Sequence, residues 1–275
     1  METLLLRTKF GFDVMWNSLI ANVSRPTRQQ VDANPGLFDP GLVKYIRELD
    51  APAIKPIELA HALYEGMRLF YKLPLETDDA ALSAYLDSIV ALRIPKPKSA
   101  PRQPPITIRH WSEFLVNRTA PSDPTRKPHG FLESYVWNAI HYLAAVPSQS
   151  AIDLLVYLSL NLVNLIGCSI CQGHLSKNID ARLQFTTNLL AAAISATPYD
   201  NTFFATCIFH DNINDINKRV PVNVCRTCPS GCSFQKFQLA TQLDAHRLAG
   251  YRNYLTKYRE IVDTPADVLL ASIQN

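Results

Sequence analysis

The sequence predicts an all-α protein, and three observations support this prediction. Apolar side chains recur at intervals of three and four residues along most of the chain, which is the spacing of one helix face. Strand-like alternation of apolar and polar residues is nearly absent. Glycine is scarce, with 9 residues in 275, about half the usual usage of ~7%. No G-x-G-x-x-G or G-x-x-x-x-G-K-[ST] string occurs, which argues against a Rossmann fold and a P-loop.

Composition and charge exclude several classes of protein. Apolar residues make up 47% of the chain and charged residues 19%, which excludes wholesale disorder. The 27 basic and 24 acidic residues leave a net charge of +3, too small to indicate a nucleic-acid partner by itself. We expect no secretory leader, because the opening apolar run is three leucines between Glu2 and Arg7. The longest apolar stretch, 151–166, carries an aspartate and two asparagines, so we expect a buried helix and no membrane span.

Prolines mark the expected domain boundary. The length of 275 residues allows one large domain or two small ones. Residues 93–109 are rich in proline and basic side chains, and no acidic residue lies between Asp87 and Glu113. Such a segment is stiff, extended and solvated, and its charge is typical of a soluble linker. A second proline-bearing loop covers 119–130. We therefore expect an N-terminal helical domain at 1–92, a Pro-rich basic linker at 93–130 and a second helical domain at 131–275.

Helical periodicity defines the elements on both sides of this linker. Before it, Leu59, Leu63, Met67 and Phe70 recur at intervals of three and four residues and mark one apolar face. The final helix is expected to start at Thr264-Pro265-Ala266-Asp267, which combines an N-cap residue, a first-turn proline and an acidic residue. The expected helices are 57–71, 80–92, 131–146, 151–166, 181–196, 201–217, 236–258 and the short one from Thr264.

The first candidate for chemistry is a C-x-x-C pair formed by Cys168 and Cys171. One apolar helix is expected to stop at Gly167 and another to start at or near Cys168, where the N-terminal N–H groups of a helix stabilise a thiolate. The βαβ context of a thioredoxin is missing. The alternative is half of a zinc site completed by Cys225 and Cys228, but the long helical stretch between the halves is unlike a compact zinc finger. The spacing favours redox chemistry.

Two further motifs place aromatic and amide side chains on helix faces. Trp137 and His141 are four residues apart, so an indole and an imidazole share one face. His210 and Asn214 repeat this spacing on a later helix. Rings and amides in one line suit a heteroaromatic ligand that needs stacking and edge hydrogen bonds. Taken singly, the first motif is better explained by a core tryptophan and a hydrogen-bonded core histidine, and the second motif alone is weak evidence for a ligand site.

In this order, the three motifs resemble the Erv family of FAD-linked sulfhydryl oxidases. The strings VWNAIHYLA, GCSICQGHL and FHDNIND look most like its viral branch, found in baculoviruses and related large DNA viruses of insects. The resemblance covers roughly residues 131–225. It implies a helical bundle that holds FAD beside the C-x-x-C pair, preceded by a second helical region that packs as a degenerate partner domain.

The resemblance also assigns roles to the redox pair and its neighbours. Cys168 and Cys171 match the redox disulfide, in which Cys171 faces the flavin and Cys168 exchanges with the incoming thiol. Trp137 and His141 match flavin- and adenine-side contacts of the first bundle helix. His174 matches the aromatic or imidazole position that often follows the pair.

The adenine and phosphate contacts depart from the family pattern. His210 and Asn214 match the ends of the His-Asn-x-x-Asn motif that holds adenine and ribose, but Asp211 replaces the middle Asn. The Gly-Arg pair that often precedes the Trp is also absent. The cations expected for the flavin phosphates are therefore Lys218 or Arg219, just past the motif.

The activity implied by the resemblance is oxidation of protein thiols to disulfides, with FAD passing electrons to O2 to give hydrogen peroxide. The expected partners are thiol-containing proteins, O2 and a second copy of the chain, with no membrane span and no nucleic acid. The implied setting is intracellular, in the cytoplasm or nucleus of an infected host cell or in the virion. There a virus would bring its own oxidase, because the host keeps thiols reduced.

A second cysteine cluster contains Cys225, Cys228 and Cys232 in a loop with proline and glycine. It is expected to form a structural disulfide or a shuttle disulfide that relays electrons to Cys168. A zinc site and an iron–sulfur cluster are the less favoured alternatives. Cys207, on an apolar helix, is expected to be an inert core thiol.

The competing hypothesis is a zinc-stabilised helical module whose basic 93–109 segment binds nucleic acid. It accounts for the 6 cysteines and the linker, but leaves the histidine-bearing helix faces without a function. A yellow protein that releases FAD on denaturation would support the oxidase. A colourless protein with stoichiometric zinc would support the rival.

Overall fold

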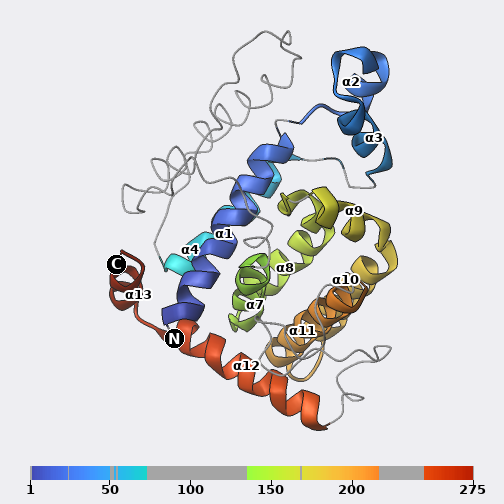
Figure 1. Ribbon diagram of the computed structural model, residues 1–275. Helices are drawn as coiled ribbons and strands as arrows, with labels where there is room; N and C mark the ends of the chain where they lie inside the picture. Colours follow the sequence, from blue (N-terminus) through green and yellow to red (C-terminus); the bar gives the residue numbers. More distant parts are fainter. Residues whose placement is uncertain are drawn as a thin grey trace.

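A computed structural model of the chain describes residues 2–23, 25–49, 53, 55–72, 135–167, 169–216 and 245–274. Within these ranges the regular structure is helical and no strand occurs, which confirms the all-α prediction (Figure 1). No helix in the described ranges is long and apolar enough to cross a bilayer. The expected helix 80–92, the linker 93–130 and the cluster Cys225/Cys228/Cys232 lie outside the described residues.

The N-terminal helices end with residue 71. They are α1 (Glu2–Val23), α2 (Arg28–Ala33), the 3-10 helix η1 (Pro35–Leu37), α3 (Pro40–Glu48) and α4 (Pro56–Tyr71). The later helices carry the sequence motifs. They are α7 (Val136–Ala145), α8 (Gln149–Asn161), η3 (Leu162–Leu165), α9 (Ser169–Lys177), α10 (Ile179–Ala193), α11 (Pro198–Ile216), α12 (Ala245–Asp263) and α13 (Ala266–Gln274).

Most expected helices are present, but several boundaries differ, and α10 and α11 each begin two or three residues earlier than expected. The single helix expected at 151–166 is instead α8 followed by η3, because the last turn tightens into a 3-10 helix whose residues are all buried. The helix expected to end at Tyr258 continues to Asp263, since Ile261 is fully buried and Arg259 pairs with Asp200 at 2.6 Å. The last helix begins at Ala266, two residues after Thr264.

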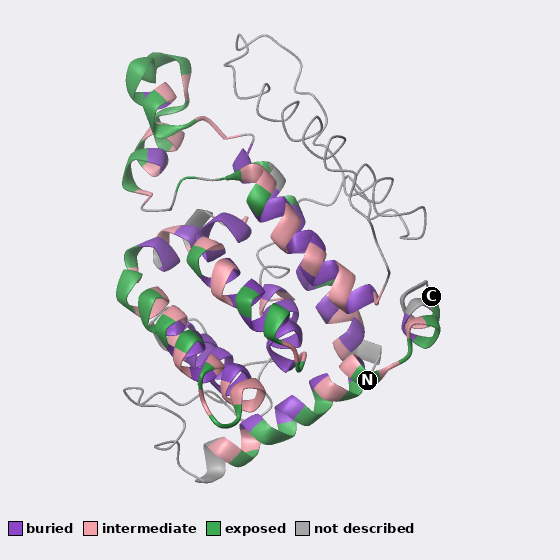
Figure 2. Cartoon of the chain, turned by 180° about the vertical axis from the view of Figure 1, so that it is seen from behind, coloured by how far each residue is buried: buried purple, intermediate pink, exposed green. Residues whose placement is uncertain are grey.

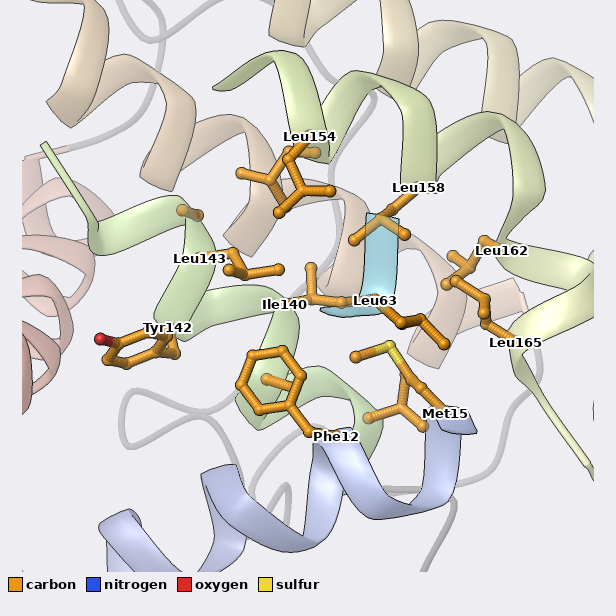
Figure 3. Packing of buried hydrophobic residues seen from close by; sticks show 14 of the residues in the cluster. Phe12, Met15, Leu63, Ile140, Tyr142, Leu143, Leu154, Leu158, Leu162 and Leu165 are labelled. Carbon is orange, nitrogen blue, oxygen red and sulfur yellow. The ribbon is translucent and has the colours of Figure 1, made fainter. Parts of the chain in front are cut away.

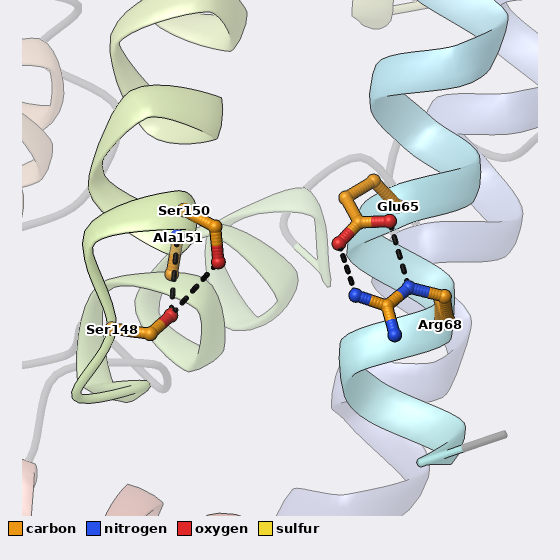
Figure 4. Close-up of polar contacts among 5 residues, drawn as sticks. All are labelled: Glu65, Arg68, Ser148, Ser150 and Ala151. Atoms are coloured by element: carbon orange, nitrogen blue, oxygen red, sulfur yellow. Dashed lines mark hydrogen bonds and ion pairs between the residues drawn. The ribbon is translucent and has the colours of Figure 1, made fainter. Parts of the chain in front are cut away.

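Four of the later helices form a bundle. Helix α7 contacts α8, α8 contacts α10, α10 contacts α11, and α11 returns to α7. Helix α12 packs across α7 and α11, and the short α9 lies against η3 and α10 (Figure 1). Ser148 caps the N-terminus of α8 by accepting a hydrogen bond from the Ala151 amide at 3.2 Å (Figure 4).

The N-terminal helices share the core of this bundle. Helix α1 packs along α7, and α4 contacts α1 and α8 (Figure 1). Figure 3 shows Phe12 and Met15 of α1 and Leu63 of α4 pointing at the bundle side chains of α7, α8 and η3. The Tyr142 hydroxyl of α7 donates to the Leu69 carbonyl of α4 at 3.0 Å. The described parts of the two expected domains are therefore joined by one hydrophobic core.

Burial and surface follow from this packing. Figure 2 shows buried residues along the inner faces of α1 and of the bundle helices, with exposed residues on α2, α3 and the outer faces. Burial also raises the pKa of the Tyr142 hydroxyl well above the usual value for tyrosine, so this side chain stays a hydrogen-bond donor at neutral pH.

An ion pair lies on the outside of α4. The guanidinium of Arg68 donates two hydrogen bonds to the carboxylate of Glu65, with N···O distances of 2.8 and 2.5 Å (Figure 4). Half-exposed pairs of this kind contribute little to stability.

Candidate functional site

The structure brings Trp137, His141 and His210 together from two helices. The Trp137 and His210 rings are stacked, with centroids 4.2 Å apart and planes 12° apart. Nε2 of His141 lies 3.0 Å from Nδ1 of His210, although the residues are 69 positions apart in the chain. Both histidines are almost completely buried, and Trp137 is partly exposed. The three residues form one cluster that reaches the surface through the indole.

The helix spacing of the sequence explains why the cluster can form. Trp137 and His141 lie on the same face of α7, one turn apart, and α11 packs against that helix. The Trp137 ring also meets the Phe209 ring edge-on at 5.7 Å, and Phe209 stacks on Phe185 of α10 at 4.2 Å. The aromatic layer is therefore continuous from α7 through α11 to α10.

Cys207 adds a third member to the histidine pair. Its Sγ lies 3.9 Å from Nδ1 of His141 in a fully buried position. When the thiol donates to Nδ1, His141 carries its proton on Nε2 and donates to His210. Cys207 was expected to be an inert core thiol; it lies in the core, and its sulfur is in contact with the His141 ring.

Helix α12 supplies tyrosines that the sequence reasoning missed. Tyr254 meets the His141 ring edge-on at 5.1 Å, and its hydroxyl lies 3.1 Å from that of Tyr258. The Tyr258 hydroxyl donates to Oδ1 of Asn138 at 3.1 Å. Nothing in the sequence distinguishes these tyrosines from other core aromatics, because their role depends on α12 folding back across α7.

The buried carboxyl group of Asp211 accepts a hydrogen bond from a tyrosine of α12. The Tyr251 hydroxyl of α12 donates to its Oδ2 at 2.5 Å. The side chain of Asp211 is 7% exposed, so this hydrogen bond offsets part of the cost of burying a carboxyl group. An aspartate at this position thus connects α11 to α12.

The C-x-x-C pair lies at the start of α9. That helix begins at Ser169, directly after Cys168, and Cys171 is its third residue, partly buried. The expected helix start near Cys168 is confirmed, whereas Cys168 itself lies outside the described residues. His174 and Asn214 lie in α9 and α11, but their side chains are not among those described, and Lys218 and Arg219 lie outside the described residues.

The residue after the C-x-x-C motif anchors α9 to the neighbouring segments. Gln172 is 1% exposed, and its amide nitrogen donates to Oδ1 of Asn22 at 3.1 Å and to the Val163 carbonyl at 3.0 Å. Its amide oxygen accepts hydrogen bonds from Arg25 at 3.2 Å and from the Tyr45 hydroxyl. The position of the C-x-x-C helix is therefore set by α3 and by the C-terminal end of α1.

Replacing Gln172 by leucine is expected to destabilise the protein by about 2 kcal/mol, because Asn22 and the Val163 carbonyl lose a buried partner. The change leaves both cysteines in place, so any loss of thiol oxidation reports on their position. Thermal unfolding and dithiothreitol oxidation are the measurements. Gln29→Leu, at an exposed residue of α2, is the control. Equal melting temperatures for the two variants would contradict the assigned role.

Metal ligands are a separate question. Within the described ranges, no three His, Cys, Asp or Glu side chains lie close enough together to hold a metal ion. The cysteines on which the zinc hypothesis depends, Cys225, Cys228 and Cys232, are outside those ranges.

Comparisons of the chain with protein-family models, with curated proteins and with solved structures found no match.

Proposed function

We propose that this protein is an FAD-linked sulfhydryl oxidase that forms disulfides in protein substrates. One observation supports the proposal most: α7 and α11 bring Trp137, His141 and His210 into a single buried aromatic cluster. The resemblance assigned these three residues to one cofactor from separate parts of the chain. A core without a ligand has no need for two hydrogen-bonded histidines, one of them stacked on a tryptophan, since buried polar groups cost free energy that apolar side chains do not.

The donor set of the cluster suits a flavin nucleotide. The partly exposed indole of Trp137 can stack on a flat heteroaromatic ring, whereas the ring nitrogens of His141 already contact His210 and Cys207. Nδ2 of Asn138 is buried, and among the described residues no acceptor lies within hydrogen-bond reach of it. A flavin or adenine ring offers carbonyl and ring-nitrogen acceptors for such a donor. Trp137, Asn138, His141 and His210 are thus the described residues that would hold FAD.

The chain's own contribution to the reaction is thiol–disulfide exchange. A substrate thiolate attacks Sγ of Cys168 in the Cys168–Cys171 disulfide, which forms a mixed disulfide and releases Cys171 as a thiolate. A second substrate thiolate attacks the mixed disulfide, releases the oxidised substrate and leaves both cysteines reduced. FAD, when bound, would supply the two-electron redox chemistry that couples this dithiol to the reduction of O2 to hydrogen peroxide. The net reaction converts two thiols and O2 into one disulfide and H2O2.

Helix α9 favours the thiolate forms in this sequence. Its first backbone N–H groups follow Cys168 directly, and they carry partial positive charge. Gln172 holds the helix against α1 and α3, so the cysteines are presented from a fixed support. The proposal is tested by purifying the full chain and recording its absorbance. A yellow protein that releases FAD on denaturation and oxidises dithiothreitol supports it, and a colourless protein with stoichiometric zinc would overturn it.

Replacing His210 by alanine is expected to lower the bound FAD and the melting temperature together. The change removes the ring that stacks on Trp137 and bonds His141. A ligand bound only to the native state stabilises it by mass action, about 2.7 kcal/mol at a hundredfold excess over Kd. FAD per folded chain and thermal unfolding with and without added FAD are the measurements.

The control for this prediction is Ile208→Ala, which makes a cavity in the same helix. Ile208 is 4% exposed, so the variant should lose stability while keeping its FAD. If His210→Ala retains full flavin and still responds to added FAD as the wild type does, His210 does not hold the cofactor.

A further inference from the structure

Helix α10 carries an apolar stripe that faces solvent. The stripe consists of Ile179, Leu183 and Leu190 of the helix and of Ile194, the residue that follows its last turn, and these are 41, 54, 54 and 89% exposed. The opposite side of the helix is buried against α8 and α11. Helix α10 lies on the side of the molecule away from α1 and α4 (Figure 1). Single exposed apolar residues are normal on a protein surface, whereas four on one helix face are typical of a contact site.

The residue types and spacings of the stripe are the same when the helix is read from either end. Its intervals are four, seven and four residues, with isoleucine at both ends and leucine at both inner positions. If two copies of α10 lie side by side in opposite directions, Ile179 of each copy meets Ile194 of the other. In the same arrangement Leu183 of each copy meets Leu190 of the other. A surface that is complementary to itself about a two-fold axis is what a symmetric dimer requires.

The charges beside the stripe favour the same arrangement. The exposed side chains between Leu183 and Leu190 are Gln184 and Thr187, both uncharged. The exposed Asp180 lies at the N-terminal end. Antiparallel pairing keeps the two copies of Asp180 about 20 Å apart, at a rise of 1.5 Å per residue. Parallel pairing would bring these like charges together.

We propose that α10 binds α10 of a second copy of the chain in an antiparallel, two-fold symmetric dimer. The stripe is of the order of a few hundred Å² per copy, which places the contact at the lower end of specific interfaces, below ~1,200 Å² in total. The dimer therefore dissociates on dilution. This inference specifies a surface for the homodimer expected above and does not rest on FAD binding.

Sedimentation of the full chain over a range of concentrations tests the proposal. The wild-type mass should rise with concentration from 30.9 kDa toward twice that value. The double variant Leu183→Glu/Leu190→Glu places like charges opposite each other across the contact and should remain monomeric. The variant Leu183→Lys/Leu190→Glu pairs each lysine with a glutamate of the other copy, so it should dimerise again. Leu37→Glu, on an exposed leucine of η1, is the control that should behave as wild type.

Each other outcome overturns the proposal. A wild-type chain that stays monomeric has no such contact. A monomeric wild type whose Glu/Glu variant melts well below it would show that another part of the same chain covers the stripe. A Glu/Glu variant that still dimerises would place the contact on another surface. Failure of the Lys/Glu variant to dimerise would exclude antiparallel pairing, because in a parallel dimer its like charges face each other.

Discussion

Serine at either position of the C-x-x-C pair is expected to abolish thiol oxidation while FAD stays bound. Cys171→Ser removes the thiolate that faces the cofactor, so dithiothreitol should no longer bleach the flavin. Cys168→Ser keeps that thiolate beside oxidised flavin and should show a long-wavelength absorbance band. Because the two thiols act as a unit in disulfide exchange, each single change should cost nearly the whole activity. Oxygen consumption with dithiothreitol and the visible spectrum are the measurements.

The matched control replaces the other cysteine cluster. A Cys225/Cys228/Cys232 triple serine variant should still oxidise dithiothreitol, since a small dithiol reaches Cys168 unaided, while losing much of its activity on a reduced protein. Normal dithiothreitol oxidation by Cys168→Ser or Cys171→Ser would overturn the redox assignment. Loss of stoichiometric zinc in the triple variant would instead favour a structural metal at that cluster.

Alanine at Gly11 is expected to lower the stability of the whole protein by about 2 kcal/mol. A Cβ on Gly11 would run into the carbonyl oxygen of Tyr135 and would lie 2.9 Å from Cβ of Ala139, so α1 would have to move off α7. Overpacking of this kind costs up to about 3 kcal/mol, and the better helix propensity of alanine returns about 1 kcal/mol. The clash is the larger effect because the nearest atom belongs to the backbone and cannot rotate away.

Thermal unfolding and FAD content measure this effect, with Gly36→Ala as the control. A Cβ on Gly36 would meet nothing within 4 Å, so its melting temperature should stay within about a degree of wild type. Gly11→Ala should melt roughly 5 °C lower, and its FAD should dissociate more easily, because α7 carries both Trp137 and His141. Identical melting curves for the two variants would mean that α1 and α7 do not share a close-packed contact.

The sequence was sufficient to predict the properties that depend on near neighbours in the chain. Three- and four-residue spacing predicted α4, α7, α8, α10 and α11 to within a few residues. The same spacing placed Trp137 beside His141 on one helix face, and the glycine before Cys168 predicted the start of α9. These features follow from helix geometry and backbone hydrogen bonding, which are local.

The tertiary structure decided the contacts between distant segments. The stacking of His210 on Trp137, the tyrosines of α12 around His141, and the attachment of Gln172 to Asn22, Arg25 and Tyr45 all join residues far apart in the sequence. Local patterns hold no information about such pairs, because any apolar helix face can pack against several others.

The division into domains illustrates the same difference. Proline content and charge predicted a separate N-terminal unit, since both are properties of the connecting segment. Whether the helices on either side share a core depends instead on how closely they approach, and α1 approaches α7 at Gly11, where the missing side chain permits it. The sequence determined most of the described helices from α4 onward, but not α1, α2 and α3, and it determined the order of the candidate site residues. Packing between helices decided which of those residues meet, because that packing is selected by the shape of whole surfaces rather than by neighbours along the chain.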